Sequence, residues 1–132
     1  MSFLKYVKEY ADHIGGQYTD YDQNRSVVVV PLESRFQTVL ATTQKSLASG
    51  KDQAVFSSKV CDITSNSIDF KQLIEQNANF DFSKFIIHDG YLKIEASCLT
   101  ASVTKEQIQE MIQEVAHLSD EYELKLTGKD VF

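Results

Sequence analysis

Four consecutive strand-like segments, with no helical pattern between them, constrain this chain more than any other feature of its sequence. The segments are Gln17–Tyr21, Arg25–Leu32, Phe36–Thr43 and Ala54–Ile63. Polar turns separate the first from the second, at residues 22–24, and the third from the fourth, around residues 50–52. Consecutive strands of this kind favour an antiparallel sheet, and we expect helices to pack against it.

The second segment contains the continuous β-branched run Val27–Val30, which predicts a strand that is covered on both of its faces. Pro31 follows this run directly and has no amide hydrogen to donate to a neighbouring strand. We therefore expect Pro31 at the end of the strand or on an edge of the sheet.

A second strand pair is predicted on either side of Asp89-Gly90, the dipeptide that best suits a type I′ turn, because both residues tolerate positive φ. The two strands are Phe85–His88 and Tyr91–Cys98. In the latter, apolar residues alternate with polar ones, which indicates a strand with one wet face.

Helical periodicity predicts the remaining elements. A first helix follows Ser2 as N-cap, has apolar residues at helical spacing and ends at Gly15-Gly16. Capping-box spacing of Asp69 and Gln72 predicts a short helix over Phe70–Asn77. The clearest helix begins after the Thr104 and Gln107 capping box, and Gly128 is its expected stop, with an earlier end at residues 124–126 as the alternative. The apolar stripes of the first and last helices are Phe3, Val7, Tyr10, Ala11 and Ile14, and Ile108, Met111, Ile112, Val115, Leu118 and Tyr122.

The resulting order is α-β-β-β-β-α-β-β-α, which predicts one α+β domain over residues 1–132 with an antiparallel β-sheet packed against helices. A net charge of −6 with scattered basic residues makes nucleic acid an unexpected partner. No apolar run approaches the ~20 residues that a membrane helix needs, so we expect a cytoplasmic protein without a membrane partner. Cys61 and Cys98 are interpreted as small buried hydrophobes and not as a disulfide.

This element order, together with several short motifs, resembles the YbjN-like family, whose fold is similar to that of type III secretion chaperones. The motifs are Val27-Val28-Val29-Val30-Pro31-Leu32-Glu33, Leu73-Ile74-Glu75-Gln76-Asn77-Ala78, His88-Asp89-Gly90 and Ser119-Asp120 in the last helix. The family's Ala-Asp pair is here Ser119-Asp120. The resemblance spans nearly the whole chain and implies a small, acidic, cytoplasmic bacterial protein, often a homodimer, that presents its sheet and helices to a partner polypeptide.

The sequence gives only weak indications of a metal site or a catalytic site. Asp20, Asp22 and Asn24 imitate the start of a calcium loop, but Arg25 stands where the loop needs glycine, so a polar hairpin tip is the better interpretation. His88 and Asp89 could form an acid–base pair, yet neighbouring strand residues point to opposite faces. His13 and His117 have no zinc-like spacing to the cysteines. No catalytic motif is recognisable, so we expect neither an enzyme nor a cofactor or metal site.

The leading hypothesis is therefore a protein-binding module resembling a secretion chaperone or adaptor. We expect Phe3, Val7 and Tyr10 to contact the partner and Leu73, Ile74 and Phe80 to form a homodimer interface. The tyrosine cluster of Tyr6, Tyr10, Tyr18 and Tyr21 is either the edge of the core or an interface. The tract 77–82 either anchors a loop through its phenylalanines or borders the dimer contact. The alternatives are a small-molecule-binding domain with an apolar pocket and a minor enzyme that uses His88 and Asp89.

Overall fold

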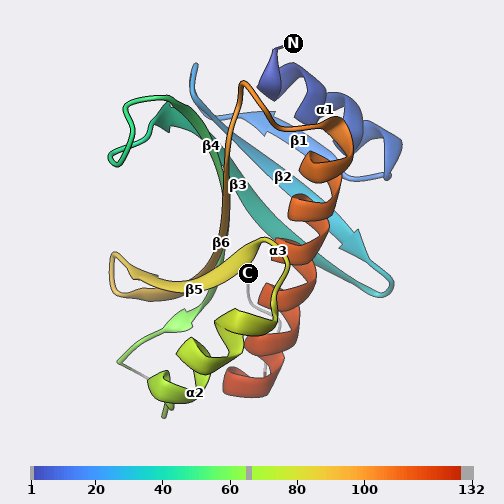
Figure 1. Ribbon diagram of the computed structural model, residues 1–132. Coiled ribbons are helices and arrows are strands. Elements are labelled where there is room, and N and C mark those ends of the chain that lie inside the picture. The colour runs from blue at the N-terminus through green and yellow to red at the C-terminus, as the bar shows by residue number, and fades with distance from the viewer. Residues whose placement is uncertain (1, 65–66, 129–132) are drawn as a thin grey trace.

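One antiparallel sheet of six strands forms the body of the protein, in the order β1-β2-β3-β4-β6-β5 (Figure 1). The computed structural model describes residues 2–64 and 67–128. The strands are β1 (Gln17–Asp20), β2 (Arg25–Leu32), β3 (Arg35–Lys45), β4 (Asp52–Asp62), β5 (Ser83–His88) and β6 (Tyr91–Leu99). Every neighbouring pair is antiparallel, so the predicted sheet type and element order are confirmed.

Three α-helices accompany the sheet in the described residues, at the places that the capping signals predict. They are α1 (Phe3–His13), α2 (Phe70–Gln76), which continues as a 3-10 turn over Asn77–Asn79, and α3 (Lys105–Thr127). Both hydrogen bonds of the Thr104 capping box are present, and Gly128 ends α3 with a positive φ of 72°. The stretch 124–126 stays helical, because this left-handed cap satisfies the carbonyl of Leu124.

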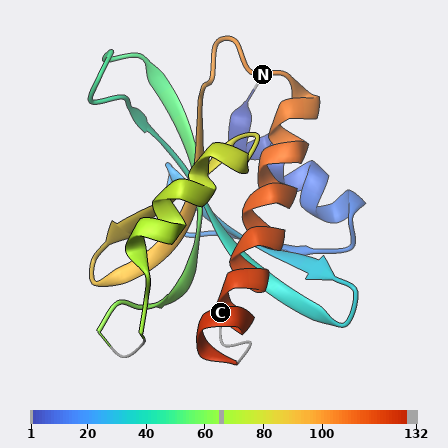
Figure 2. The same ribbon diagram turned by 60° about the horizontal axis from the view of Figure 1, so that its bottom comes forward.

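Helices α1 and α3 lie together on one side of the sheet, while the β3–β4 and β5–β6 hairpins extend toward the other side (Figure 1). In the view of Figure 2, α2 lies in front, between α3 and the β5–β6 hairpin. Two tyrosines of α1 join it to α3: the Tyr6 hydroxyl accepts from Gln109 Nε2 at 2.6 Å and the Tyr10 hydroxyl accepts from Gln113 Nε2 at 2.9 Å. The two helices thus form one layer.

The covered face of the sheet supplies the core. Its fully buried side chains include Val28, Val39, Phe56 and Ile94, and the ring of Phe3 packs 5.5 Å from that of Phe56. The prediction that β2 is covered on both faces was wrong. Val27 and Val29 are only partly buried. Helices α1 and α3 both lie on the other side of this part of the sheet (Figure 1).

One turn and one strand end have the conformations that their residues predict. Asp89 and Gly90 adopt φ of 52° and 78°, the paired positive values of a type I′ turn. Pro31 lies one residue from the end of β2 and beyond the last β1 pairing, at Val29, so one side of the strand is an edge there. Its missing amide hydrogen therefore costs no ladder bond on that side.

Candidate functional site

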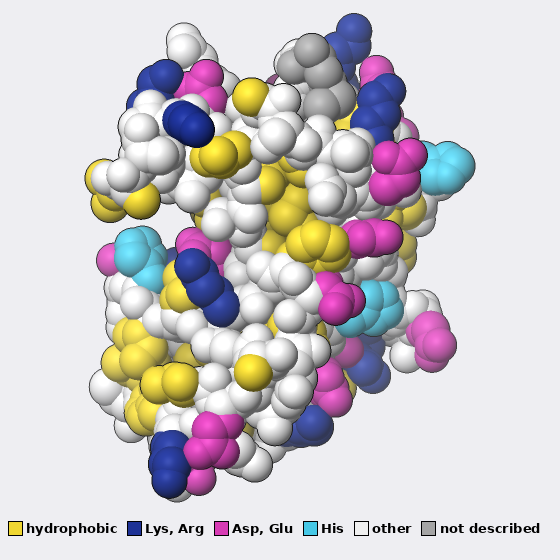
Figure 3. Space-filling model, in the orientation of Figure 1, with side chains coloured by type: hydrophobic (Ala, Val, Ile, Leu, Met, Phe, Trp, Pro, Cys, Tyr) yellow, Lys and Arg dark blue, Asp and Glu magenta, His cyan; other side chains and the backbone are white. Residues whose placement is uncertain are grey.

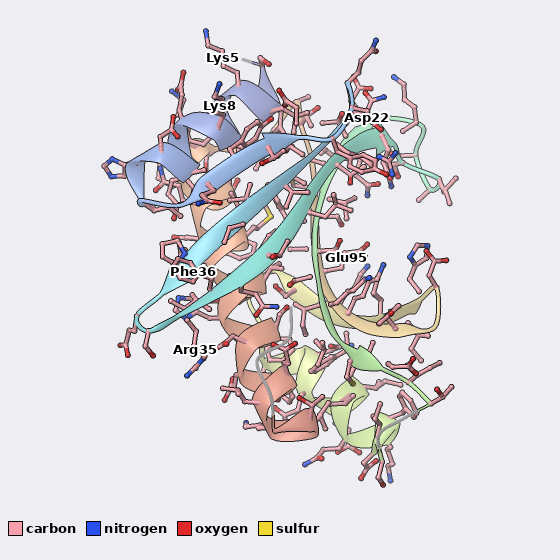
Figure 4. The ribbon with its side chains drawn as sticks, turned by 180° about the vertical axis from the view of Figure 1, so that it is seen from behind. Lys5, Lys8, Asp22, Arg35, Phe36 and Glu95 are labelled. Carbon is pink, nitrogen blue, oxygen red and sulfur yellow. The ribbon has the colours of Figure 1, made fainter. Side chains whose placement is uncertain are left out.

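A groove of about 500 Å³ runs between the outward side of α1 and the hairpin that β1 begins. Its lining residues are Leu4, Lys5, Lys8, Tyr18, Asp20, Asp22 and Gln23. In the rear view of Figure 4, Lys5 and Lys8 lie on α1 and Asp22 lies at the tip of the hairpin. The groove therefore has an apolar part, from Leu4 and Tyr18, and rims of opposite charge.

Strand β1 borders this groove and forms one edge of the sheet. Within residues 2–64 and 67–128, β1 pairs with β2 alone. The backbone of an edge strand presents hydrogen-bonding groups to whatever lies beside it. The groove and the strand edge together form a surface on which an extended peptide could pair with the backbone and insert apolar side chains.

The three residues predicted to contact a partner are all buried in the isolated chain. Val7 has no exposed surface, and Phe3 and Tyr10 each keep 8% of theirs. They form the side of α1 that packs on the sheet, whereas Lys5 and Lys8 are exposed and Leu4 is partly buried between the two sides. A contact between a partner and Phe3, Val7 or Tyr10 stays a prediction, and it would require α1 to move.

The residues that imitate a calcium loop form a hairpin tip. One carboxylate oxygen of Asp22 accepts from the Asn24 backbone at 2.9 Å, and the other accepts from Arg25 at 2.9 and 2.7 Å. The hydrogen bond from Arg25 is the main cause that lowers the pKa of Asp22, followed by the one from Asn24. The Arg25 guanidinium also lies 4.4 Å from the centre of the Tyr21 ring. These contacts occupy the Asp22 oxygens, as a polar turn requires.

A second surface consists of the outward side of α2 and the neighbouring edge strand β5. Phe70, Ile74 and Ile87 are exposed there, Ile74 by 68% and Ile87 by 55%. They border an apolar groove of about 260 Å³ with Leu73 and Ile86. Figure 3 shows hydrophobic side chains gathered toward its lower left, where α2 and β5 meet. Since single exposed apolar residues are normal but clusters are not, this α2–β5 surface is a candidate interface.

The residues predicted for the dimer interface take different positions around the α2–β5 surface. Ile74 lies on it, and Leu73 is buried beneath it. Phe80 packs in an aromatic cluster, with ring centres 5.7 Å from Phe85 and 6.5 Å from Tyr122. Sequence reasoning missed Phe70 and Ile87. The predicted Asp89-Gly90 turn could have indicated Ile87, because it places Ile87 opposite Leu92 on the covered side, in a strand that is the edge of the sheet.

His88 and Asp89 approach each other, contrary to the expectation that they point to opposite faces. Their Nδ1 and Oδ2 atoms are 3.4 Å apart, because Asp89 belongs to the turn and not to the strand. His88 Nδ1 also lies 3.1 Å from Lys93 Nζ. Both side chains are mostly in water, with exposed fractions of 62% and 77%. An exposed pair in water offers little of the preorganised environment on which acid–base catalysis depends.

The cysteines are free thiols, Cys61 buried and Cys98 half-buried. Burial is the largest cause that raises the pKa of each thiol, so neither is activated as a nucleophile. Across the part of the chain that the structure describes, no three His, Cys, Asp or Glu side chains gather as a metal site would require. No helix in these ranges is long and apolar enough to cross a membrane.

Comparison with known proteins gives a likeness in fold. No family model and no curated protein sequence matches the chain. The chain is similar to one in the ExsC–ExsE complex, with 15% identity, a TM-score of 0.63, and 90% of this chain and 89% of that chain covered. It is also similar to one in the heterodimeric ExoU–SpcU complex from the type III secretion system of Pseudomonas aeruginosa, with 11% identity, a TM-score of 0.54, and 95% and 98% covered.

These likenesses confirm the predicted fold class, an α+β fold like that of type III secretion chaperones. At 15% and 11% identity they establish the fold alone. The resemblance to the YbjN-like family stays a prediction.

Proposed function

We propose that this chain is a cytoplasmic, non-enzymatic polypeptide-binding module that holds a partner segment in the manner of a secretion chaperone. The observation that carries the proposal is the open edge of β1. It lies beside the groove between α1 and the β1–β2 hairpin, which we call the α1–β1 groove. An extended segment can add a strand to β1 and place an apolar side chain against Leu4 and Tyr18. The two structures named above are complexes between two proteins, which supports the same kind of role for this chain.

The opposite charges on the two rims of the groove would orient a bound partner segment. Lys5 and Lys8 lie on the α1 side, and Asp20 lies on the hairpin side. Rim charges govern the rate and orientation of encounter more than the final affinity. We therefore expect a bound segment with acidic residues toward α1 and a basic residue toward the hairpin.

Reversing both lysines, Lys5→Glu and Lys8→Glu, is expected to weaken partner binding about tenfold, mainly through slower association. The fold should stay intact, because both side chains are exposed. The tagged chain is first used to capture its partner from native lysate, with a tag-only control and mass spectrometry. The purified pair is then titrated with each variant.

The matched control is Lys51→Glu with Lys71→Glu, which makes the same charge change at two exposed sites outside the groove. Unchanged affinity in the control with a loss in the groove variant supports the site. Equal losses would assign the effect to net charge, and no loss in either would reject the groove.

We also propose that two copies associate through the α2–β5 surface. Strand β5 is the other edge of the sheet, and the exposed Phe70, Ile74 and Ile87 give that edge an apolar flank. Pairing of two such surfaces would bury the apolar groove and cover an open strand edge.

Ile74→Asp with Ile87→Asp is expected to convert a species of about twice 15.0 kDa into a monomer, measured by light scattering after gel filtration. The matched control is Leu47→Asp, a fully exposed hydrophobic residue in the β3–β4 turn, which should leave the mass unchanged. A wild-type monomer at all concentrations would reject the dimer. A thermal shift with a hydrophobic ligand panel would then test the alternative of a small-molecule-binding domain with an apolar pocket.

A further inference from the structure

The two halves of α3 meet the sheet through side chains of different chemistry. In the first half, the buried residues are Ile108, Met111, Ile112 and Val115, which keep at most 1% of their surface exposed. In the second half, the buried residues are Ser119, Asp120 and Glu123. The first half is therefore held by fully buried apolar side chains, whereas the apolar residues of the second half that pack against the core, Tyr122 and Leu126, are only partly buried.

The polar residues beneath the second half are incompletely satisfied. Gln37 of β3 has no exposed surface; its amide nitrogen donates to Ser58 at 2.9 Å, but its Oε1 atom has no hydrogen-bond partner. The Ser119 hydroxyl is equally buried and has no partner either. Buried polar atoms in this state reduce the free energy that holds the surrounding elements together.

An ion pair joins this half of α3 to the β2–β3 hairpin. Arg35 donates to both carboxylate oxygens of Asp120, with Nε–Oδ1 at 2.9 Å and Nη2–Oδ2 at 2.6 Å. The Asp120 side chain is almost buried and the Arg35 side chain is 41% exposed. On the other flank, the ring of Tyr122 packs edge-on against that of Phe85 at 4.8 Å.

We infer that Ser119–Thr127 forms a strap, which opens from the sheet as a unit while residues 105–118 stay packed, and that the Arg35–Asp120 pair is its latch. Segments with few apolar contacts are the ones that open locally at a free energy below that of global unfolding. Opening would uncover the covered face of β4 near Cys61, beside the α2–β5 surface. This inference does not depend on the proposed partner or dimer.

Cys61 provides a built-in reporter of the strap. It is 2% exposed and lies on β4, the strand against which α3 packs most extensively. In a Cys98→Ser background Cys61 is the remaining thiol of the chain. Its rate of reaction with a thiol reagent then measures how often the strap opens.

Arg35→Ala is expected to raise the labelling rate of Cys61 about tenfold, because a hydrogen-bonded charge pair at a part-buried site is lost. The matched control is Lys125→Ala, which removes the Lys125–Glu121 pair, an exposed ion pair on the strap itself. This control should change the rate by less than about twofold.

Two further readouts distinguish strap opening from global unfolding. Labelling of Cys61 at low urea should depend only weakly on urea, because a local opening exposes little surface. Amide hydrogen exchange should be at least about tenfold faster over residues 119–127 than over 108–116. Labelling that follows the steep urea dependence of global unfolding, or equal protection of both halves of α3, would overturn the inference.

Discussion

Gly16→Ala is expected to destabilise the protein by about 3 kcal/mol or more, the upper part of the range for overpacked sites. A Cβ atom at Gly16 would lie 2.4 Å from the carbonyl oxygen of Val29 and 3.4 Å from that of Ala11. Val29 belongs to β2, which is paired on both sides at this position, so its backbone has no room to withdraw. The junction between α1 and β1 would have to shift instead, and with it the α1–β1 groove.

The measurement is urea unfolding, with melting temperature as a second readout; a loss of this size lowers the melting temperature by roughly 10 °C or more. Gly15→Ala is the matched control. Gly15 has a φ of +74° but nothing within 4 Å of a new Cβ, so it should cost only about 1–2 kcal/mol of backbone strain. A larger loss at Gly15 than at Gly16 would show that close approach to Val29 is not the constraint.

Glu114→Ala is expected to cost about 3 kcal/mol, because one carboxylate on α3 serves three backbone amides. Its oxygens accept from Asp81 at 2.9 Å, from Phe82 at 2.9 Å and from Ser83 at 2.7 Å. Asp81 and Phe82 lead into β5 and Ser83 is its first residue, so the side chain holds the start of the edge strand to α3. Glu114→Gln keeps an acceptor without the charge and should lose less, about 1–2 kcal/mol.

The same contacts predict a dependence on pH. Burial would raise the pKa of Glu114, but the hydrogen bonds from Ser83, Phe82 and Asp81 together outweigh it and hold the pKa below its ordinary value. The stabilisation is therefore complete above the ordinary carboxyl range and disappears as the pH falls through the lowered pKa. Urea unfolding of wild type and Glu114→Gln, at about pH 7 and about pH 3, should show a difference that shrinks in acid. A difference that stays constant would assign the effect to packing.

Local signals in the sequence were sufficient for the elements and their order. The Thr104 capping box, the Asp89-Gly90 turn and the alternation within Tyr91–Cys98 each act over a few residues, so the folded chain realises them as predicted. The largest error was the prediction that the strand containing Val27–Val30 is covered on both faces. An apolar run is compatible with a strand covered on one face or on both, and only the placement of α1 and α3 decides between them.

The candidate surfaces were harder to predict. The stripe Phe3, Val7 and Tyr10 marks the apolar side of α1, and periodicity identifies such a side without saying what covers it. Leu4 and Lys8 became groove residues because they lie on the flank of the helix that faces the hairpin, where Leu4 is partly buried and Lys8 is exposed. Ile87 is exposed although its pairing is with buried Leu92, because β5 is the edge of the sheet and no further strand lies beside it.

By itself, then, the sequence determined the helices, the strands, their antiparallel connection and the acidic charge of the chain, all of which depend on neighbours within a few positions. The tertiary structure decided which apolar residues form the core, which edge strands stay open, and which contacts join distant segments. Arg35 meets Asp120, and Glu114 meets the start of β5, across separations of 85 and 31–33 residues. Such contacts depend on how the helical layer lies on the sheet, and no local pattern specifies that arrangement.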